Sequence, residues 1–268
     1  MRLAIISDVH ANLEALHAAL GDIAGQRVDQ IVCLGDIVGY NTESAKCIDL
    51  LRQAGATCVA GNHDRAVAGQ ITTDAFSSLA ARGVAWTRAH LSADDLEYLA
   101  GLPLRASIQG ELVAVHGALH PDIGCESLRL DSDKLRRLSF NALVAHASRA
   151  RICAFGHTHQ VGIYELRGDR MRMNQEDEVA MSEEAYYLIN PGTVGQPRSS
   201  ERRATYLVLD TALGVIVVRR IDYDAGLTLA KTRRAGLLPR SHIIPSPIRS
   251  ALRWGARELG RRWYRSSP

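Results

Sequence analysis

The 268-residue sequence has no long apolar run, no internal repeat and no low-complexity segment. A helix that crosses a membrane needs roughly 18 consecutive apolar residues, so we expect none here. A secretory signal is not expected either, because the run from Met1 to Ile6 leads directly to Asp8 without the charged and apolar regions of such a signal. These absences favour a globular protein.

Cysteine is scarce and does not form the pattern of a disulfide framework. The five cysteines are odd in number, scattered, and mostly placed within apolar segments: Cys33, Cys47, Cys58, Cys125 and Cys153. Disulfides are rare in reducing compartments, and buried thiols are common there. We therefore expect reduced thiols in the core of a cytoplasmic protein.

The charge is divided unevenly along the chain. Hydrophobic residues make up 46% and charged residues 23%, which is typical of one large domain with at most a small appendage. Residues 231–268 hold ten Lys or Arg and one acid, whereas residues 1–230 hold 22 Lys or Arg and 28 Asp or Glu. The sequence thus predicts an acidic domain over residues 1–235 and a basic tail over residues 236–268.

The tail has the pattern of a basic amphipathic helix that begins at about residue 247. Ser246 and Pro247 are typical of a helix start. Apolar residues then share one helical face and arginines another, namely Ile248, Leu252, Leu259 and Trp263 against Arg249, Arg253, Arg257 and Arg261. Such a helix can dock on the acidic body, cover a contact between subunits, or bind nucleic acid or an anionic membrane.

The first 60 residues alternate apolar strands with helical patterns. Strands are expected at residues 2–7, 30–34 and 57–60, with helices from Asn12, a good N-cap, and over residues 42–53. This order predicts a parallel sheet with right-handed crossovers. Ligands of such sheets bind beyond the carboxyl ends of the strands.

The rest of the chain predicts a second sheet. Residues 74–100 and 126–148 look helical, residues 102–108 and 111–115 look like a hairpin, and residues 151–155 look like a strand. Four further segments are expected to be antiparallel strands of the second sheet: 161–166, 185–189, 204–209 and 215–221. The predicted fold is α/β, a four-layer α/β/β/α sandwich of two mixed sheets with the basic amphipathic helix at the C-terminus.

Seven residues that can ligate metals follow the ends of predicted strands in short motifs. The motifs are Asp8-Val9-His10, Gly35-Asp36, Gly61-Asn62-His63-Asp64, Val115-His116-Gly117 and Gly156-His157-Thr158-His159. Folding does not require so many polar side chains beside apolar strands. Two divalent ions do require them, because they need nitrogen and oxygen donors held on rigid elements.

The spacing assigns chemistry to several of these residues. The two oxygens of the Asp36 carboxylate allow it to touch both ions. Asp8 and His10 lie two residues apart, which in extended backbone puts both side chains on one side, facing one ion. The same spacing recurs at His157 and His159, and that pair can straddle two ions.

The remaining motif residues complete the expected centre. Asn62 offers a neutral carbonyl oxygen and His116 another imidazole. Two aspartates and a bridging hydroxide leave two divalent ions with a residual charge near +1, which attracts anions such as phosphate esters. His63 follows Asn62 and is expected to face the substrate, where it can protonate or stabilise a leaving alkoxide, with Asp64 holding its ring by a hydrogen bond.

Together these motifs resemble the calcineurin-like metallophosphoesterase superfamily over roughly residues 1–230, and most closely its small bacterial phosphodiesterases, some of which are called protein-phosphatase-like. The turn Asn190-Pro191-Gly192 also belongs to that pattern. The resemblance implies one ion on Asp8, His10, Asp36 and His159, and a second on Asp36, Asn62, His116 and His157. It further implies that His63 is the catalytic acid, that Asp64 orients it, and that a metal-bridging hydroxide attacks phosphorus.

The resemblance implies a dinuclear metal-dependent phosphoesterase, with Mn, Fe, Zn or Ni as cofactors and Mn favoured. A phosphodiesterase acting on a phosphate ester, possibly a nucleotide, is the leading hypothesis. The alternatives are a phosphomonoesterase or protein phosphatase, a nuclease aided by the basic tail, a hydrolase of other esters, and a metal-binding scaffold without activity. An oligomer is possible.

Three residues outside the ligand set are weaker candidates. Arg198 follows the Asn190 turn and can bind a substrate phosphate, or else pair with a nearby acid or lie in solvent. Tyr40 can line the pocket, or else be a half-buried loop residue. We expect Asn190 itself to shape the turn beside the site.

Overall fold

The computed structural model describes residues 1–120 and 125–238. Its strands are β1 (Arg2–Ile6), β2 (Gln30–Cys33), β3 (Thr57–Cys58), β4 (Arg105–Ile108), β5 (Leu112–Val115), β6 (Ile152–Ala154), β7 (Val161–Arg167), β8 (Arg170–Asn174), β9 (Glu178–Ala180), β10 (Tyr186–Pro191), β11 (Ala204–Asp210) and β12 (Val215–Ile221). Its helices are α1 (Leu13–Gly25), α2 (Ser44–Gln53), α3 (Asn62–Ala68), α4 (Ser78–His90), α5 (Ala93–Ala100), α6 (Asp133–Val144) and α7 (Ala225–Arg234). The helix predicted from about residue 247 lies outside the described residues.

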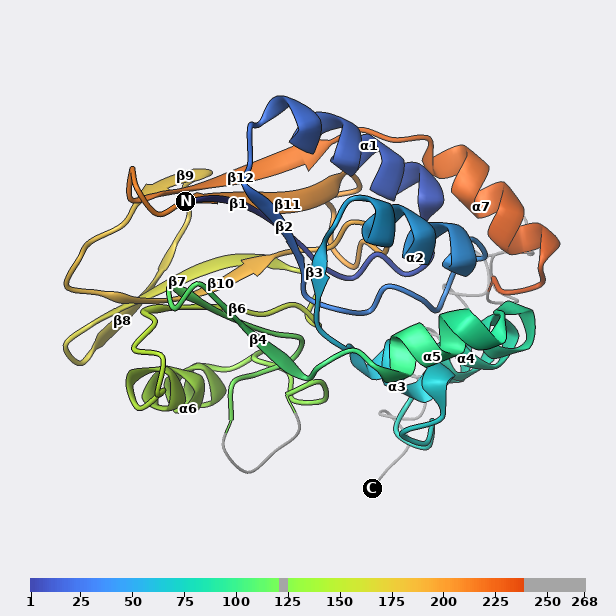
Figure 1. Cartoon of the computed structure of the whole chain (residues 1–268), viewed down its shortest axis with the longest axis horizontal. Helices are drawn as coiled ribbons and strands as arrows, with labels where there is room; N and C mark the ends of the chain where they lie inside the picture. Colours follow the sequence, from blue (N-terminus) through green and yellow to red (C-terminus); the bar gives the residue numbers. More distant parts are fainter. Residues whose placement is uncertain (121–124, 239–268) are drawn as a thin grey trace, which may run out of the picture.

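The strands form two mixed sheets that face each other, as predicted (Figure 1). The first has the order β3-β2-β1-β11-β12-β9, with β1, β2 and β3 parallel and β11 antiparallel to β1. The second has the order β4-β5-β6-β10-β7-β8, with β5, β6 and β10 parallel. The hairpin of β4 and β5 is confirmed.

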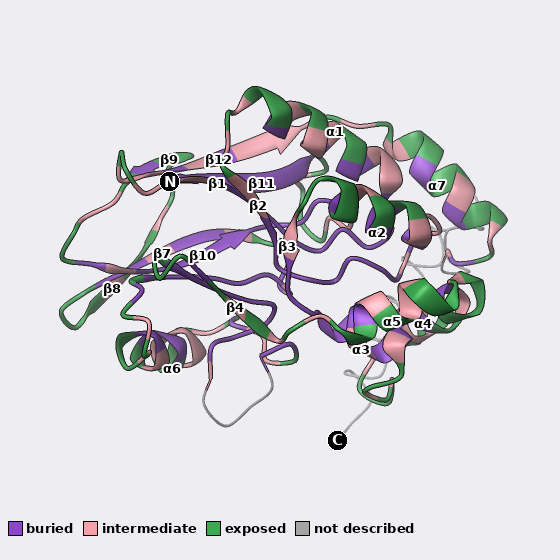
Figure 2. Cartoon of the chain, in the orientation of Figure 1, coloured by how far each residue is buried: buried purple, intermediate pink, exposed green. Residues whose placement is uncertain are grey.

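Alternating side chains of β1 divide the interior into separate cores. Leu3 and Ile5 pack between the two sheets, whereas Ala4 and Ile6 pack under the helices that cover the first sheet. This follows from the pleat, which sends successive side chains to opposite faces. A third core lies between the second sheet and α6, where Phe140 is fully buried. Figure 2 shows the buried strands between partly exposed helices, which is the predicted four-layer sandwich.

Helices α1 and α2 lie on the outer side of the first sheet, with α7 packed beside α1, and α6 lies on the outer side of the second (Figure 1). Helix α1 begins where the sequence predicts, because the side chain of Asn12 accepts a hydrogen bond from the main-chain N–H of Ala15 at 3.1 Å. Helices α3, α4 and α5 gather at the end where β3 leaves the first sheet.

One prediction about the strands was wrong. Strands β11 and β12 were expected in the second sheet, but β11 pairs with β1 and β12 with β11 in the first. Almost all of β11 is buried, so its sequence marks a central strand without revealing which sheet it joins. Helix α3, which begins at the ligand Asn62 and has seven residues, was not among the predicted helices.

The cysteines agree with the expectation of core thiols. All five are buried and free. In the part of the chain that the structure describes, no helix is both long enough and apolar enough to cross a membrane.

Candidate metal centre

The predicted ligand motifs meet at one end of the sandwich. Asp8 follows β1, Asp36 follows β2 and Asn62 follows β3, while His116 and His157 follow β5 and β6 of the other sheet. Within each of three groups, the ligand atoms lie within 4.8 Å of one another. The groups are Asp8, His10 and His159; His10, Asp36 and His63; and Asp36, His116 and His157. The groups share members, so they form one continuous cluster.

Several predicted ligands have a left-handed backbone, which corrects the geometry expected from the sequence. The φ angles of Asp8 and His10 are 55° and 49°, so the motif is not extended. Asp36, His157 and His159 also have positive φ angles, of 52°, 62° and 60°. Non-glycine residues rarely adopt this conformation, and it costs on the order of 1 kcal/mol or more at each position. Five such residues in one cluster indicate that the fold is strained to aim these side chains inward.

Three histidines are oriented so that a nitrogen lone pair faces the cluster. In each, Nδ1 lies against a main-chain carbonyl oxygen: His10 on Val38 at 3.1 Å, His116 on Leu34 at 2.7 Å and His159 on Gln196 at 2.6 Å. A carbonyl only accepts hydrogen bonds, so Nδ1 carries the proton and Nε2 of the neutral ring has the lone pair. Histidines that bind metals are held in this way.

The carboxylate of Asp36 lies between the two halves of the cluster. Its Oδ2 is 3.6 Å from Nε2 of His10 and 3.3 Å from Nε2 of His116. Its Oδ1 accepts a hydrogen bond of 2.8 Å from the main-chain N–H of His63, which fixes the orientation of the group. A single oxygen of Asp36 is thus placed to contact an ion on either side.

The two histidines of the Gly-His-Thr-His motif belong to different groups of the cluster, His159 to that of Asp8 and His10 and His157 to that of Asp36 and His116. Nε2 of His159 lies 3.1 Å from Oδ1 of Asp8, and Nδ1 of His157 lies 3.2 Å from Nε2 of His116. The other oxygen of Asp8 accepts hydrogen bonds from the Ser7 hydroxyl at 2.7 Å and from the N–H of His157 at 3.1 Å. Sequence reasoning missed Ser7, although it directly precedes the first motif.

Burial and charge indicate that the cluster is built for cations. Oδ1 of Asp8 and Oδ1 of Asn62 are buried without hydrogen-bond partners, which is costly unless an ion satisfies them. Burial opposes the charged form of His116, but Asp36 outweighs it and raises the pKa of His116 to about 9. Burial raises the pKa values of the Asp8 and Asp36 carboxyls. The neighbouring His159 and His116 outweigh burial and hold both carboxyl pKa values below the usual range. The residues therefore fit two divalent ions, whose charge would replace these protons.

Two glycines allow the ligands to approach this closely. A Cβ atom at Gly61 would collide with Oδ1 and the main-chain nitrogen of Asp36. A Cβ atom at Gly156 would collide with the hydroxyl of Ser7 and approach Oδ2 of Asp8. Any side chain at these positions would displace the carboxylates.

The hydrogen bond predicted between Asp64 and the ring of His63 is absent. Nδ1 of His63 is buried and has no hydrogen-bond partner. The carboxylate of Asp64 instead accepts three main-chain N–H groups, from Ile37 at 2.9 Å, Val38 at 3.2 Å and Gly61 at 2.9 Å. Asp64 therefore joins the loop after β2 to the start of α3, and it positions Asp36 and His63 through the backbone.

The cluster opens into a cleft of about 450 Å³ that is lined by Asp36, Asn62, His63 and His157. Tyr40 and Arg198 line the same cleft, and a guanidinium nitrogen of Arg198 lies 3.4 Å from the Tyr40 hydroxyl. Asn190 shapes the adjoining turn, as expected. Its amide donates to the carbonyl of Gly156 at 2.8 Å and its oxygen accepts from the N–H of Gly192 at 2.9 Å.

Residues 1–214 match the family model described as the calcineurin-like phosphoesterase superfamily domain. The chain belongs to this superfamily. An uncharacterized protein of Methanocaldococcus jannaschii is 35% identical over 227 residues, which cover 83% of this chain and 88% of that protein. The resemblance inferred from the motifs is thereby confirmed.

The comparison with solved structures supports the same fold. A metallophosphoesterase from Sphaerobacter thermophilus is 36% identical, with a TM-score of 0.73, and the match covers 90% of this chain and 96% of that one. A hypothetical protein from Pyrococcus horikoshii is 17% identical with a TM-score of 0.70, over 94% of this chain and 97% of the other. The second likeness concerns the fold alone.

The cleft of this phosphoesterase also contains residues that sequence reasoning missed. Phe76, Ser77, Ser127 and Arg129 all line it. Phe76 precedes α4 and Arg129 precedes α6, both in segments that were predicted to be largely helical. Nothing in their sequence pattern marks them, because their place in the cleft depends on long-range packing.

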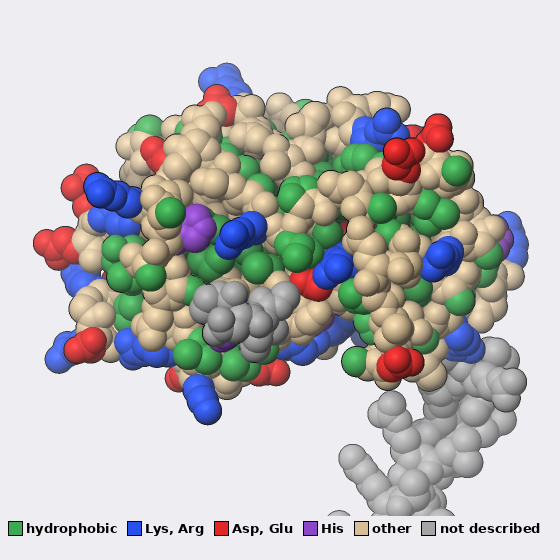
Figure 3. All heavy atoms as spheres, turned by 60° about the horizontal axis from the view of Figure 1, so that its bottom comes forward, with side chains coloured by type: hydrophobic (Ala, Val, Ile, Leu, Met, Phe, Trp, Pro, Cys, Tyr) green, Lys and Arg blue, Asp and Glu red, His purple; other side chains and the backbone are tan. Residues whose placement is uncertain are grey.

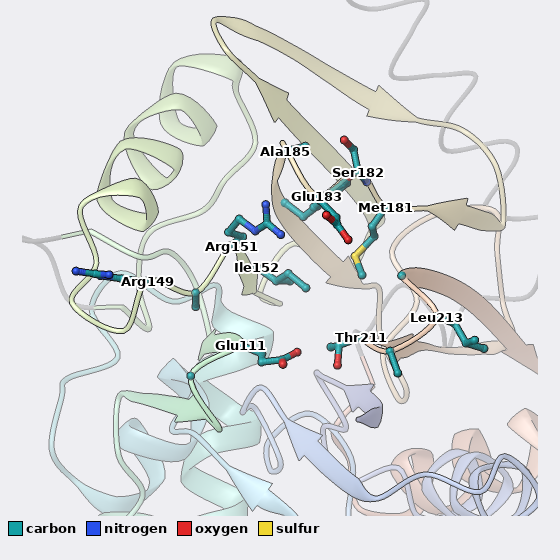
Figure 4. A pocket seen from close by; sticks show the side chains of 15 residues that line it. Glu111, Arg149, Arg151, Ile152, Met181, Ser182, Glu183, Ala185, Thr211 and Leu213 are labelled. Carbon is teal, nitrogen blue, oxygen red and sulfur yellow. The ribbon is translucent and has the colours of Figure 1, made fainter.

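A different cavity, of about 470 Å³, lies at the opposite end of the sandwich, beside the β4–β5 and β11–β12 turns. Figure 4 shows Arg151 and Glu183 near its centre and Arg149 pointing away. Glu111 also lines it, so two basic residues are balanced by two acidic ones. None of the predicted ligands lines this cavity, and we assign the chemistry to the cleft at the metal cluster.

Proposed function

We propose that this protein is a metal-dependent phosphodiesterase with two divalent ions, Mn being favoured. The observation that carries the proposal is the geometry of three Nε2 atoms: those of His10 and His116 both face Oδ2 of Asp36, and that of His159 faces Oδ1 of Asp8. The first ion would be held by Asp8, His10, Asp36 and His159, and the second by Asp36, Asn62, His116 and His157. When bound, these ions would supply positive charge to a phosphate and acidify water for its attack.

The chain's own residues have separate tasks in this proposal. Asp36 sets the distance between the two halves, and its hydrogen bond to the main chain keeps it from rotating. The ring of His63 lines the cleft beside the cluster, where it can donate a proton or a hydrogen bond to the leaving oxygen. Arg198 is placed to pair with phosphate oxygens.

The shape of the cleft supports a diester over a monoester. Its volume of about 450 Å³ lies within the range of roughly 300–1,000 Å³ that is usual for small-ligand sites. Phe76 lies on one wall, next to His63, and Ser127 and Arg129 lie on a segment that precedes α6. A diester has a substituent on each side of the phosphate and can contact both of these segments, whereas a monoester has only one substituent.

The face drawn in Figure 3 supports a small substrate over a long nucleic acid. On the face drawn in Figure 3, the Lys and Arg side chains of the described residues are interspersed with acidic and hydrophobic ones and form no continuous strip. Nucleic-acid enzymes usually carry such a strip to contact successive phosphates. The division at residue 235, the partner of the basic tail, the oligomeric state and the cytoplasmic location remain predictions from the sequence.

The test is hydrolysis of bis-p-nitrophenyl phosphate and p-nitrophenyl phosphate side by side. Metal-stripped protein is compared with protein refilled with Mn²⁺, and metal content is measured by mass spectrometry. We expect turnover that depends on Mn²⁺ and favours the diester. We expect the His63→Ala variant to retain two ions per chain and to lose most of its turnover.

Each contrary result has a definite meaning. Preference for the monoester would replace the proposal with a phosphatase. A folded protein that binds two ions but hydrolyses neither ester with any first-row metal would favour a binding scaffold. Loss of an ion from His63→Ala would make His63 a ligand, which its position near His10 and Asp36 permits.

A further inference from the structure

Helix α7 turns hydroxyl groups toward the protein and large apolar side chains toward solvent. Thr228 and Thr232 lie four residues apart on one helical face and are 6% and 4% exposed. Leu227 and Leu229, on either side of that face, are 46% and 51% exposed. A helix that packs only to bury apolar surface shows the reverse pattern. The inward face of α7, which packs beside α1, is therefore built for specific hydrogen bonds (Figure 1).

Thr232 reaches a ligand of the metal cluster through one intermediate side chain. Its hydroxyl lies 2.9 Å from Oδ1 of the buried Asn41, whose amide donates to the main-chain carbonyl of His10 at 2.8 Å. That carbonyl only accepts, so it fixes the orientation of the Asn41 amide, and the Thr232 hydroxyl must donate to Oδ1. The same hydroxyl faces the carbonyl of Thr228 at 2.9 Å, so one proton serves two acceptors.

Thr228 reaches the support of a second ligand. Its hydroxyl lies 2.9 Å from Oδ1 of the buried Asn12, the N-cap of α1. The amide of Asn12 donates to the carbonyl of Gly195 at 2.9 Å. The next residue, Gln196, accepts a hydrogen bond of 2.6 Å from Nδ1 of His159. A chain of hydrogen bonds thus leads from α7 to the turn that orients His159.

Lys231 fixes α7 to the two helices beside it. Its Nζ lies 2.6 Å from Oε1 of Glu14 and 3.2 Å from Oε1 of Glu43. Glu14 belongs to the first turn of α1, and Glu43 directly precedes α2. These helices follow the loops that carry His10 and Asp36. The lysine therefore joins the starts of both helices at the end of the sheet where the cluster lies.

These contacts lead to one side of the cluster. Asp8, His10 and His159 form one group of ligand atoms, which we call the first half. His116 and His157 of the second half follow β5 and β6, which belong to the other sheet. Helix α7 lies beside the first sheet, and its residues come after the range of 1–214 that matches the family model.

We propose that α7 is a positioning element that sets the affinity of the first half for its ion. Thr232 holds the main chain of His10 through Asn41, and Thr228 holds the turn beside His159 through Asn12. Both threonines act through these intermediates and do not touch the ion. The inference rests on the two-ion centre of the proposed function and gives the two halves different supports.

The experiment measures the two ions separately in the metal-stripped full chain. His116→Ala keeps the ligands of the first half, and His159→Ala keeps those of the second. Thr228→Val and Thr232→Val, which keep the shape of the side chain and remove its hydroxyl, are introduced into each background, singly and together. The Kd for Mn²⁺ is measured by isothermal titration calorimetry, and circular dichroism checks that each protein is folded.

We expect each valine variant to raise the Kd of the His116→Ala protein by about three- to tenfold. This is less than the roughly 10–100-fold that follows loss of a direct partner of a ligand, because each threonine acts through a further side chain. The Kd of the His159→Ala protein should change by less than about twofold, because the second half has other supports.

Two kinds of control separate positioning from a general loss of stability. Thr228→Ser and Thr232→Ser keep the hydroxyl and should restore the Kd of the His116→Ala protein. Leu229→Ala, at an exposed position of the same helix, should leave both backgrounds unchanged.

The intact cluster gives a second readout that requires no ligand to be removed. Two Mn²⁺ ions that share a bridging oxygen couple magnetically, whereas a lone ion gives the signal of an isolated Mn²⁺ in electron paramagnetic resonance. At two equivalents of Mn²⁺, the double variant Thr228→Val/Thr232→Val should show a larger share of the uncoupled signal than the unmodified chain.

An equal rise in Kd in both backgrounds would overturn the inference, because it would indicate a general loss of stability. An unchanged Kd in the His116→Ala background, or serine variants that fail to restore it, would also overturn it. Absence of ester hydrolysis would remove the proposed phosphodiesterase activity and leave these binding results standing. Failure of the unmodified chain to bind any ion would remove both.

Discussion

Asp64 offers the sharpest test of how the metal cluster is supported. Its buried carboxylate accepts three main-chain N–H groups, from Ile37, Val38 and Gly61. In Asp64→Ala all three lose their acceptor, and each buried unsatisfied donor costs about 1–3 kcal/mol. With partial relaxation we expect a loss of about 3–6 kcal/mol, a large part of the roughly 5–15 kcal/mol that stabilises a typical domain.

The Asp64→Asn variant gives a graded comparison. Its amide oxygen can still accept from Ile37 and Val38, but its NH₂ group would face the N–H of Gly61, donor against donor. We therefore expect an intermediate loss of about 1–3 kcal/mol. Asp49→Ala, at an exposed position of α2, should change the stability by less than about 0.5 kcal/mol.

The assay is urea unfolding followed by circular dichroism on metal-free protein, so that ion binding does not add to the measured stability. A loss below about 1 kcal/mol in Asp64→Ala would refute the structural role of these hydrogen bonds. Unchanged stability together with strongly reduced kcat in Asp64→Asn would support the catalytic role that the sequence predicted.

Three further predictions concern other parts of the chain. Asp36→Asn should weaken both ions together, because one oxygen serves both halves; equilibrium dialysis that shows either site unchanged would exclude a bridge. Asp22→Asn should lower the free energy of unfolding by about 1 kcal/mol at pH 7, because Asp22 forms a bidentate, partly exposed pair with Arg219 at 2.9 and 3.1 Å. The Arg219 hydrogen bonds lower the pKa of Asp22 below 3.8, so this stabilisation is present above that pH and is lost as the pH falls through the lowered pKa; a difference between the two proteins that does not shrink as the pH is lowered would contradict it. Deleting residues 240–268 should leave hydrolysis of bis-p-nitrophenyl phosphate within about twofold, a change of about 0.4 kcal/mol; a folded, inactive truncation would show that the tail helps to form the site.

The candidate ligands were predictable because their signal is local. Each lies in a short polar motif directly after an apolar strand, and the carboxyl ends of β1, β2 and β3 meet at one edge of a sheet. The N-cap of α1 at Asn12 and the β4–β5 hairpin were predictable for the same reason. These features depend on residues only a few positions apart.

Other features were decided by contacts between distant segments. The pairing of β11 with β1 joins residues about two hundred positions apart, and an almost wholly buried strand carries no mark of its partner. The left-handed backbone at Asp8 and His10 occurs where their N–H groups bond to the carbonyls of Gly35 and Asp36, and the two-residue spacing does not reveal these long-range contacts.

The sequence by itself determined which side chains can bind metal and that they end strands of an α/β fold, since residue type and hydrophobic period are local properties. Only the tertiary structure decided how they are aimed. It gave Asp64 three main-chain partners instead of the ring of His63, and it brought Phe76 and Arg129 to the cleft. The orientation of a side chain and its neighbours depend on packing across the whole chain, which is why the candidate ligands could be picked from the sequence and the lining of the cleft could not.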